Sequence, residues 1–252
     1  MSTTEAPVAV DEPVIVEVKD HKLFITLNRP KSLNAHNEPM RYAIEAAIDR
    51  LDNDDTLVAA ILKGNGRAFS AGADLKEERP FLPGRTGNEH FYRVEQAKKP
   101  VIACLHGYAV GGGLELGLCC DIRVACADAL LGTPEARTFG GMPGIAVHRL
   151  PQMIARGEAM KIMLSSQPIT AQRAYEIGLV QEVAPDYESM VAAAERLADQ
   201  MAECSLPALK RIKQLTSWTF ANEVIESHRF GRLAGAEEPG NADRSKFLKR
   251  DR

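Results

Sequence analysis

The sequence predicts an α/β fold in which helices connect strands by crossovers. Two β-rich segments open the chain, and strand-like and helix-like segments then alternate along most of its length. Glycine-rich turns separate several of the strands from the helices that follow. From Thr170 onward the pattern is mainly helical. These observations favour an α/β core that carries a helical C-terminal region.

The first half of the chain starts with a predicted hairpin. Residues 14–18 and 23–27 are β-rich, and the turn-like stretch 19–22 separates them. Asn37 precedes Glu-Pro-Met, which predicts a helix with Asn37 as its cap and proline in its first turn. Residues 58–62 predict a buried strand that ends at glycines 64 and 66. A loop and a short helix are expected between this strand and Lys99. The apolar stripe expected on the first helix comprises Tyr42, Ile44, Ala47, Ile48 and Leu51.

The second half continues the alternation and ends in helices. Strands are expected over 100–105 and 121–126, and glycines 111–113 turn the chain between them into a helix that reaches about Cys120. Thr170 is the expected cap of a helix over 171–177, which Gly178 closes. The remaining predicted helices cover 188–204, 206–217 and 222–233. We therefore divide the chain into a disordered tail over 1–13, a core over 14–185 and a helical region over 186–252.

Composition and charge exclude several classes of protein. The net charge of -3 gives no overall field that would attract nucleic acid or an anionic membrane. Residues 1–13 lack the features of a targeting peptide, and no run of about 18 apolar residues predicts a membrane span. The five cysteines lie mostly in apolar runs without a CxxC pair, which indicates buried thiols rather than zinc ligands. We therefore expect a cytoplasmic protein without a metal site.

Two turns rich in small residues are candidate sites for an anionic group. Gly111, Gly112 and Gly113 follow a strand and precede a helix, where backbone N–H groups lack partners and a ligand can approach closely. Such a turn binds a phosphate or a developing oxyanion, although helix packing alone also explains the glycines. The turn over 71–74 offers further N–H groups, or is an ordinary loop. A Rossmann site is excluded because the GxGxxG spacing is absent.

Two glutamates lie close to these turns. Glu115 follows the glycine run within an apolar helix, where a carboxylate is costly without a function or a partner. Glu135 follows Pro134 at the expected start of a helix, where a carboxylate is favourable for the helix itself. If the fold brings them together, the two carboxylates can divide acid and base roles on one substrate.

The chain resembles the enoyl-CoA hydratase/isomerase family, also called the crotonase family. The resemblance extends from about residue 14 to 185, with a weaker match in the helical tail. It is carried by several segments in the family's order: 25–34 (ITLNRPKSLN), 66–76 (GRAFSAGADLK), 100–103 (PVIA), 107–113 (GYAVGGG), 121–123 (DIR), 169–171 (ITA) and 178–180 (GLV). These segments are more specific for the family than for one reaction.

The resemblance implies a fold, a ligand and an assembly. The fold is a spiral of β-β-α units with a helical C-terminal region that forms homotrimers, often paired into hexamers. The ligand is an acyl-CoA thioester, and no metal or redox cofactor is implied. Ala73 and Gly112 match the two N–H donors that bind the thioester oxygen. The residues that match the CoA- and substrate-binding segments are Lys31, Ser32, Leu33, Ala71, Asp74, Leu75, Lys76 and Gly111. Lys31 and Lys76 are equally interpretable as solvated surface lysines.

Glu115 and Glu135 match the two glutamates of the hydratase members. The implied reaction is the reversible syn addition of water to a 2-enoyl-CoA, a hydro-lyase step of fatty-acid metabolism. One glutamate acts as base for attack at C3 and the other as acid toward C2, and the sequence does not assign these roles. If the two carboxyl groups share a proton, they titrate as a pair.

The segment 137–148 departs from the hydratase pattern. Residues 143–150 read PGIAVHRL, one residue shorter than the family's usual stretch and without its Gly-Gly pair. Arg137, Thr138 and Phe139 are larger or more polar than the small aliphatic residues expected there. This departure predicts an acyl group that differs from that of a simple straight-chain substrate. His148 is a possible additional catalyst, but we interpret it as a helix-surface or core histidine.

Other functions stay open on the same scaffold. Isomerases use one glutamate as a shuttle between C2 and C4, and hydrolases, decarboxylases and carnitinyl-CoA-type dehydratases reuse the oxyanion hole. The presence of both glutamates favours a hydratase. A non-catalytic CoA-thioester binder, or an RNA-binding scaffold, is the alternative of another class. The acidic pI and the lack of a basic-aromatic stretch argue against RNA, and a binder would not need both glutamates.

Overall fold

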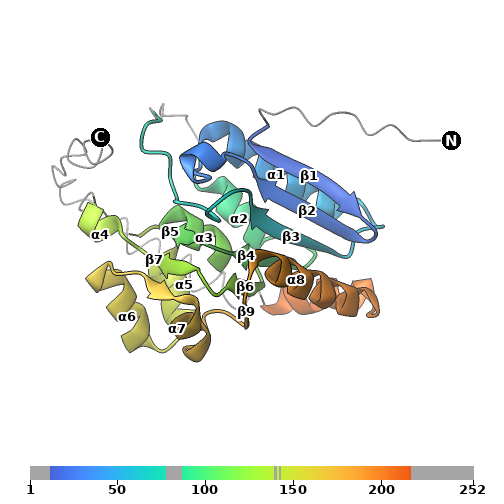
Figure 1. Ribbon diagram of the computed structural model, residues 1–252. Helices are drawn as coiled ribbons and strands as arrows, with labels where there is room; N and C mark the ends of the chain where they lie inside the picture. Colours follow the sequence, from blue (N-terminus) through green and yellow to red (C-terminus); the bar gives the residue numbers. More distant parts are fainter. Residues whose placement is uncertain (1–11, 78–86, 139–140, 142, 217–252) are drawn as a thin grey trace.

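The computed structural model describes residues 12–77, 87–138, 141 and 143–216 (Figure 1). Within these ranges the strands form a six-stranded and a three-stranded sheet. In spatial order, the larger sheet contains β1 (Val14–Lys19), β2 (Lys22–Leu27), β3 (Ala59–Gly64), β4 (Val101–Leu105), β6 (Ile122–Cys126) and β9 (Glu182–Ala184). The smaller sheet contains β5 (Tyr108–Val110), β7 (Leu130–Gly132) and β8 (Ile169–Thr170).

The two sheets are built from a repeated β-β-α unit. In the larger sheet only β1 and β2 are antiparallel neighbours, and every later pair is parallel. In successive units β4 leads to β5 and helix α3 (Gly112–Leu118), and β6 leads to β7 and helix α4 (Glu135–Thr138). The segment after β3 follows the same course, because isolated bridges join Ala68 to Gly107 and Ser70 to Ala109. The predicted spiral of β-β-α units is confirmed.

The remaining helices surround these sheets. They are α1 (Glu38–Asn53), α2 (Glu89–Glu95), α5 (Ala146–Met153), α6 (Arg156–Ser165), α7 (Ala171–Glu176) and α8 (Tyr187–Ala202), together with the single turn η1 (Pro30–Ser32) and a helical segment over 206–216. The predicted caps are in place: Asn37 accepts from the Met40 N–H, and Thr170 accepts from the Arg173 N–H. No helix in the described ranges is long and apolar enough to cross a membrane.

Apolar packing covers both faces of the larger sheet, which explains why every residue of β2 is buried. One face and the helices α1, α2, α3 and α5 enclose the larger core cluster. The other face packs against α8, which lies along the sheet in Figure 1. Met190, Ala194 and Ala198 of α8 are buried in this second cluster with Ile61 and Ile102 of the sheet. The first helix of the predicted C-terminal region is thus part of the core layers.

Most predicted elements occur within one or two residues of their expected bounds. The three-residue strands β5 and β7 were not predicted, and β5 lies between the strand at 101–105 and the glycine turn. Residues 1–11 of the expected tail and the expected helix over 222–233 lie outside the described residues. Cys104, Cys119, Cys120 and Cys126 are buried free thiols as expected, whereas Cys204 is exposed.

Candidate active site

A cavity of about 510 Å³ lies between the glycine turn and helix α4. Its lining comes from residues 33–36, from the turn at 71–75, from α2, and from the starts of α3 and α4. Figure 1 shows how this arises, since α3 and α4 each begin where a strand of the smaller sheet ends. The β-β-α repeat therefore places two helix starts at one cavity.

The glycine turn has a shape that only glycine adopts without strain. Gly111 has φ +56° and ψ −130°, and its N–H donates to the Gly132 carbonyl at 2.9 Å. A Cβ at Gly111 would lie 2.9 Å from Oε1 of Glu135, and one at Gly113 would lie 2.3 Å from the Ser70 carbonyl oxygen. The glycines thus bring the backbone of α3 close to both the 70–74 turn and Glu135.

The Ala73 and Gly112 N–H groups are placed to act together. His36 N–H donates to the Gly72 carbonyl at 2.7 Å, and Asp74 N–H donates to the His36 carbonyl at 3.1 Å. These bonds flank Ala73, whose own N–H bonds to no group in the described ranges. A Cβ on Gly112 would lie 3.4 Å from the Ala73 nitrogen, so the two backbone segments are in contact. Gly112 is the first residue of α3, where the N–H has no intrahelical acceptor.

Glu115 is buried in α3, with 6% of its surface exposed. Its carboxylate Oε1 accepts from the Ala146 N–H at 3.2 Å, at the start of α5. Burial raises the pKa of Glu115, and the backbone N–H groups of residues 144–146 oppose that rise. The carboxylate therefore has hydrogen-bond donors that favour its ionised form.

Glu135 lies at the first position of α4 with 7% of its surface exposed. Its Oε2 atom is buried and has no hydrogen-bond partner in the described part of the chain. Burial, with a further contribution from the charge of Glu115, raises the pKa of Glu135 to about 7. Both glutamates line the same cavity and burial raises the pKa of each, but only Glu115 has backbone N–H groups that oppose this rise from a neighbouring segment.

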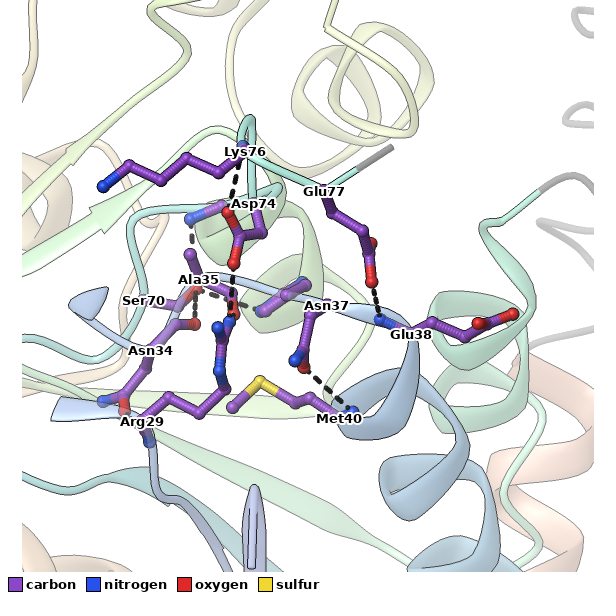
Figure 2. Close-up of polar contacts among 12 residues, drawn as sticks. Arg29, Asn34, Ala35, Asn37, Glu38, Met40, Ser70, Asp74, Lys76 and Glu77 are labelled. Atoms are coloured by element: carbon purple, nitrogen blue, oxygen red, sulfur yellow. Dashed lines mark hydrogen bonds and ion pairs between the residues drawn. The ribbon is translucent and has the colours of Figure 1, made fainter. Parts of the chain in front are cut away.

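The structure brings most of the predicted site residues to the cavity. The lining includes Glu115, Glu135, Ala73, Gly112, Leu33, Ala71, Leu75 and Gly111. Lys31, Ser32, Asp74 and Lys76 are not part of it. The Asp74 carboxylate accepts from Arg29 at 2.9 Å and from the Lys76 N–H at 3.1 Å (Figure 2), so this carboxylate stabilises the turn. Binding of CoA by these four residues stays a prediction.

The unusual segment 137–148 supports the site through its backbone. A Cβ on Gly144 would lie 3.2 Å from Oε1 of Glu115, so the shortened stretch passes close to this carboxylate. Thr138 lines the cavity, but its hydroxyl donates to the Pro134 carbonyl at 3.0 Å. Arg137 is exposed, and half-buried His148 does not line the cavity. Residues 139, 140 and 142, which include the bulky Phe139, lie outside the described ranges.

Comparison with known proteins identifies the family of the chain. The model of the enoyl-CoA hydratase/isomerase family matches residues 19–234. The chain belongs to this family. The resemblance inferred from the sequence is therefore confirmed, and so is the crotonase-like fold.

The similarity to individual relatives covers most of each chain. A short-chain-enoyl-CoA hydratase of Clostridium acetobutylicum is 35% identical over 242 residues, which cover 91% of this chain and 92% of that protein. The 2,3-dehydroadipyl-CoA hydratase of Escherichia coli is 37% identical over 206 residues and 80% of each chain. The crystal structure of a probable enoyl-CoA hydratase from Mycobacterium smegmatis superposes with a TM-score of 0.77 at 30% identity, covering 86% of this chain and 89% of that chain.

Several cavity residues of this family member were not identified from the sequence. His36, His90 and Arg41 are buried and line the cavity, and the buried Ser70 contacts His36. Ser70 stands inside the quoted 66–76 segment, but no role was assigned to it. His36 and His90 are 54 positions apart, and no spacing pattern connects two residues whose contact depends on the fold.

Proposed function

We propose that the chain is an enoyl-CoA hydratase that adds water reversibly across the C2–C3 double bond of a 2-enoyl-CoA. The observation that carries this proposal is the pair of buried carboxylates, Glu115 and Glu135, at one cavity beside the start of α3. Membership of the family and the names of the relatives support the same reaction. An isomerase would require only one of the two glutamates.

The Ala73 and Gly112 N–H groups are proposed to bind the thioester oxygen. Both belong to segments that line the cavity, and neither N–H has an acceptor in the described ranges. Donors aimed at this oxygen polarise the carbonyl and stabilise the enolate that forms when water attacks C3. Loss of one such donor typically costs about 3 kcal/mol of barrier.

The surroundings of the two glutamates suggest how they divide the proton transfers. We assign Glu115 as the base, because backbone N–H groups favour its carboxylate. It takes a proton from water as the water oxygen bonds to C3. We assign Glu135 as the acid, because it is neutral below a pKa of about 7 and donates its proton to C2. The pair returns to its starting state when one proton passes from Glu115 to Glu135.

The remaining parts of the proposal concern ligand and assembly. CoA enters as part of the substrate, and the reaction as written needs no other cofactor. We propose that the chain acts as a homotrimer or a dimer of trimers, since Leu164 and Ile212 are largely exposed on the single chain. The four buried free thiols favour a cytoplasmic location.

The direct test follows the absorbance of the conjugated enoyl thioester in crotonyl-CoA. The wild type is expected to remove this absorbance, and Glu115→Gln and Glu135→Gln are each expected to lower kcat by a factor of about 10² to 10⁴. Glu17→Gln, on the exposed part of β1, is the control and should retain full activity. A wild type that binds crotonyl-CoA without hydrating it would contradict the proposal and indicate another acyl-CoA reaction.

A further inference from the structure

A buried serine and a buried histidine lie directly behind the 70–74 turn. Ser70 has no exposed surface and His36 only 2%. The Ser70 hydroxyl donates to the Asn34 carbonyl at 2.8 Å and accepts from the Gly72 N–H at 3.1 Å. Figure 2 shows Ser70 next to Asn34 at this contact. Nε2 of His36 lies 3.0 Å from the same hydroxyl oxygen.

Hydrogen bonds hold both the carbonyl and the N–H of Gly72. Its carbonyl accepts from the His36 backbone N–H at 2.7 Å, and its N–H donates to Ser70 Oγ. The peptide between Gly72 and Ala73 is planar and trans, so a carbonyl that points toward His36 requires the Ala73 N–H to point the opposite way. Gly72 has φ +91° and no Cβ, so its own side chain does not restrict this peptide and neighbouring groups must hold it.

The hydrogen bonds around the Ser70 hydroxyl show which ring nitrogen of His36 carries the proton. A hydroxyl has one proton, and the Asn34 carbonyl takes that of Ser70. Gly72 N–H is a donor as well, so the third contact of Ser70 Oγ must come from a protonated Nε2 of His36. The other ring nitrogen, Nδ1, lies 3.4 Å from Nε2 of His90, and the two rings meet edge to face. His36 therefore donates to Ser70 from a ring that His90 orients.

We propose that Ser70 and His36 are positioning residues that aim the Ala73 N–H at the thioester oxygen. This inference rests on the proposed function, in which Ala73 is one of the two donors. Neither side chain needs to touch the reacting atoms. Ser70 acts through the Gly72 N–H, and the His36 ring acts through Ser70.

The test compares three variants by turnover and by spectroscopy. Ser70→Ala removes the hydroxyl, and His36→Leu removes the ring donor at similar volume. His36→Gln places an N–H near the position of Nε2 and should rescue the contact. We expect Ser70→Ala and His36→Leu to lower kcat by 10- to 100-fold with a smaller change in KM, and His36→Gln to stay within about threefold of the wild type.

The spectroscopic measurement reports directly on hydrogen bonding to the thioester carbonyl oxygen. An arylacryloyl-CoA absorbs at longer wavelength when its carbonyl oxygen is hydrogen-bonded. We would record this shift with each variant in a Glu135→Gln background, which slows turnover enough for the spectrum of the bound probe to be recorded. Ser70→Ala and His36→Leu should lose at least half of the shift, and His36→Gln should keep it. The control is His106→Leu, because His106 is also buried and contacts the Gly66 carbonyl at 3.0 Å, but does not line the cavity.

The outcomes separate this inference from the proposed function. If the wild type hydrates crotonyl-CoA while Ser70→Ala and His36→Leu keep the full spectral shift, the inference is wrong and the function stands. If His36→Gln and His36→Leu lose the same amount of kcat and of spectral shift, the donor role of the His36 ring is also wrong. If the wild type shows the shift but no hydration, the function fails and the variants still test the positioning. A wild type that hydrates crotonyl-CoA without any shift would overturn the inference alone, and a wild type with neither shift nor hydration would overturn both.

Discussion

Glu135 is a carboxylic acid held where its charge is poorly solvated. Burial raises its pKa from the usual 4.5 to about 7, and Oε2 has no partner in the described ranges. A carboxyl group whose pKa is raised in the folded state stabilises the fold fully below the unfolded pKa. That contribution is lost as the pH rises through the folded pKa. The wild type should therefore lose stability between about pH 5 and pH 8.

Glu135→Gln should remove this pH dependence, because glutamine stays neutral. One unit of pKa corresponds to about 1.4 kcal/mol. The stability of Glu135→Gln relative to the wild type should thus increase by roughly 2 kcal/mol between pH 5 and pH 8. Urea unfolding at the two pH values measures this difference. Glu17→Gln, which changes an exposed glutamate, should give no such trend, and a constant difference for Glu135→Gln would show that Glu135 is not titrating in this range.

Gly111 combines a backbone requirement with a contact to the site. Alanine is strained at φ +56° and ψ −130°, which costs about 1 to 3 kcal/mol. Its Cβ would also lie 2.9 Å from Oε1 of Glu135. Gly111→Ala should lower the free energy of unfolding by that amount and reduce kcat at least tenfold, as measured by denaturation and by crotonyl-CoA hydration.

Gly157→Ala is the matched control for this substitution. Gly157 lies near the start of α6, and a Cβ there would meet no atom within 4 Å. Alanine should raise stability by up to about 1 kcal/mol through its helix propensity and leave activity unchanged. Full activity of Gly111→Ala would mean that Glu135 is not confined by the glycine turn.

At the scale of elements, segments with a strong local signal were predicted, whereas the short strands β5 and β7 and the helices α5 and α6 were not. Asn37 and Thr170 correctly indicated where α1 and α7 begin, because a capping side chain acts within four residues of the chain. The strands β5 and β7 span three residues each, which is too short for an alternating pattern to appear. They form because the repeated unit places them beside each other, and this long-range pairing is invisible to local patterns.

The same limit applies to the site. The glycine turn and both glutamates could be found from the sequence, because each stands next to a strong local signal. The N–H groups that face Glu115 come from residues 144–146, in a stretch that departs from the family pattern. The contact between His36 and Ser70 depends on bringing the chain after η1 against the 70–74 turn. Only the fold supplies such contacts.

The helical segment 206–216 is attached to the sheet through one buried lysine. Nζ of Lys213 donates to Asp121 Oδ2 at 2.6 Å and to the Lys99 carbonyl at 3.1 Å. The same Asp121 oxygen accepts from the Val101 N–H, at the start of β4. Replacing Lys213 by an apolar residue removes the donor from the Asp121 carboxylate and the Lys99 carbonyl. Such a loss typically costs about 1 to 3 kcal/mol of stability.

Lys213→Met should therefore loosen this segment locally. We expect its backbone amides to exchange hydrogen about tenfold faster or more, since about 1.4 kcal/mol corresponds to a factor of ten. Lys210→Met is the control, because Lys210 contacts the well-exposed Asp55 at 3.1 Å and such surface pairs contribute little. Unchanged exchange in Lys213→Met would mean that apolar packing alone holds the segment.

Among the described residues, large apolar side chains are exposed on several elements, and two of them lie on the helices α6 and α7. Leu164 of α6 is 73% exposed and Tyr175 of α7 is 51% exposed. Arg173 joins these two helices by its contact with Glu158 at 2.6 Å, and they lie together in Figure 1. Single exposed apolar side chains are common, and we take these two, on helices that an ion pair joins, as candidates for a protein contact. This surface is where we expect subunits to meet.

The expected assembly has a mass of three or six times the 27.5 kDa of one chain. Leu164→Glu should shift it toward single chains, because a carboxylate enclosed in an interface loses its solvation without gaining a partner. Light scattering after size-exclusion chromatography measures the mass of the wild type and of Leu164→Glu. The control is Val18→Glu, which adds the same charge at an exposed position of β1, away from α6 and α7. A single-chain mass for the wild type would contradict the trimer, and an unchanged mass for Leu164→Glu would place the contact on another surface.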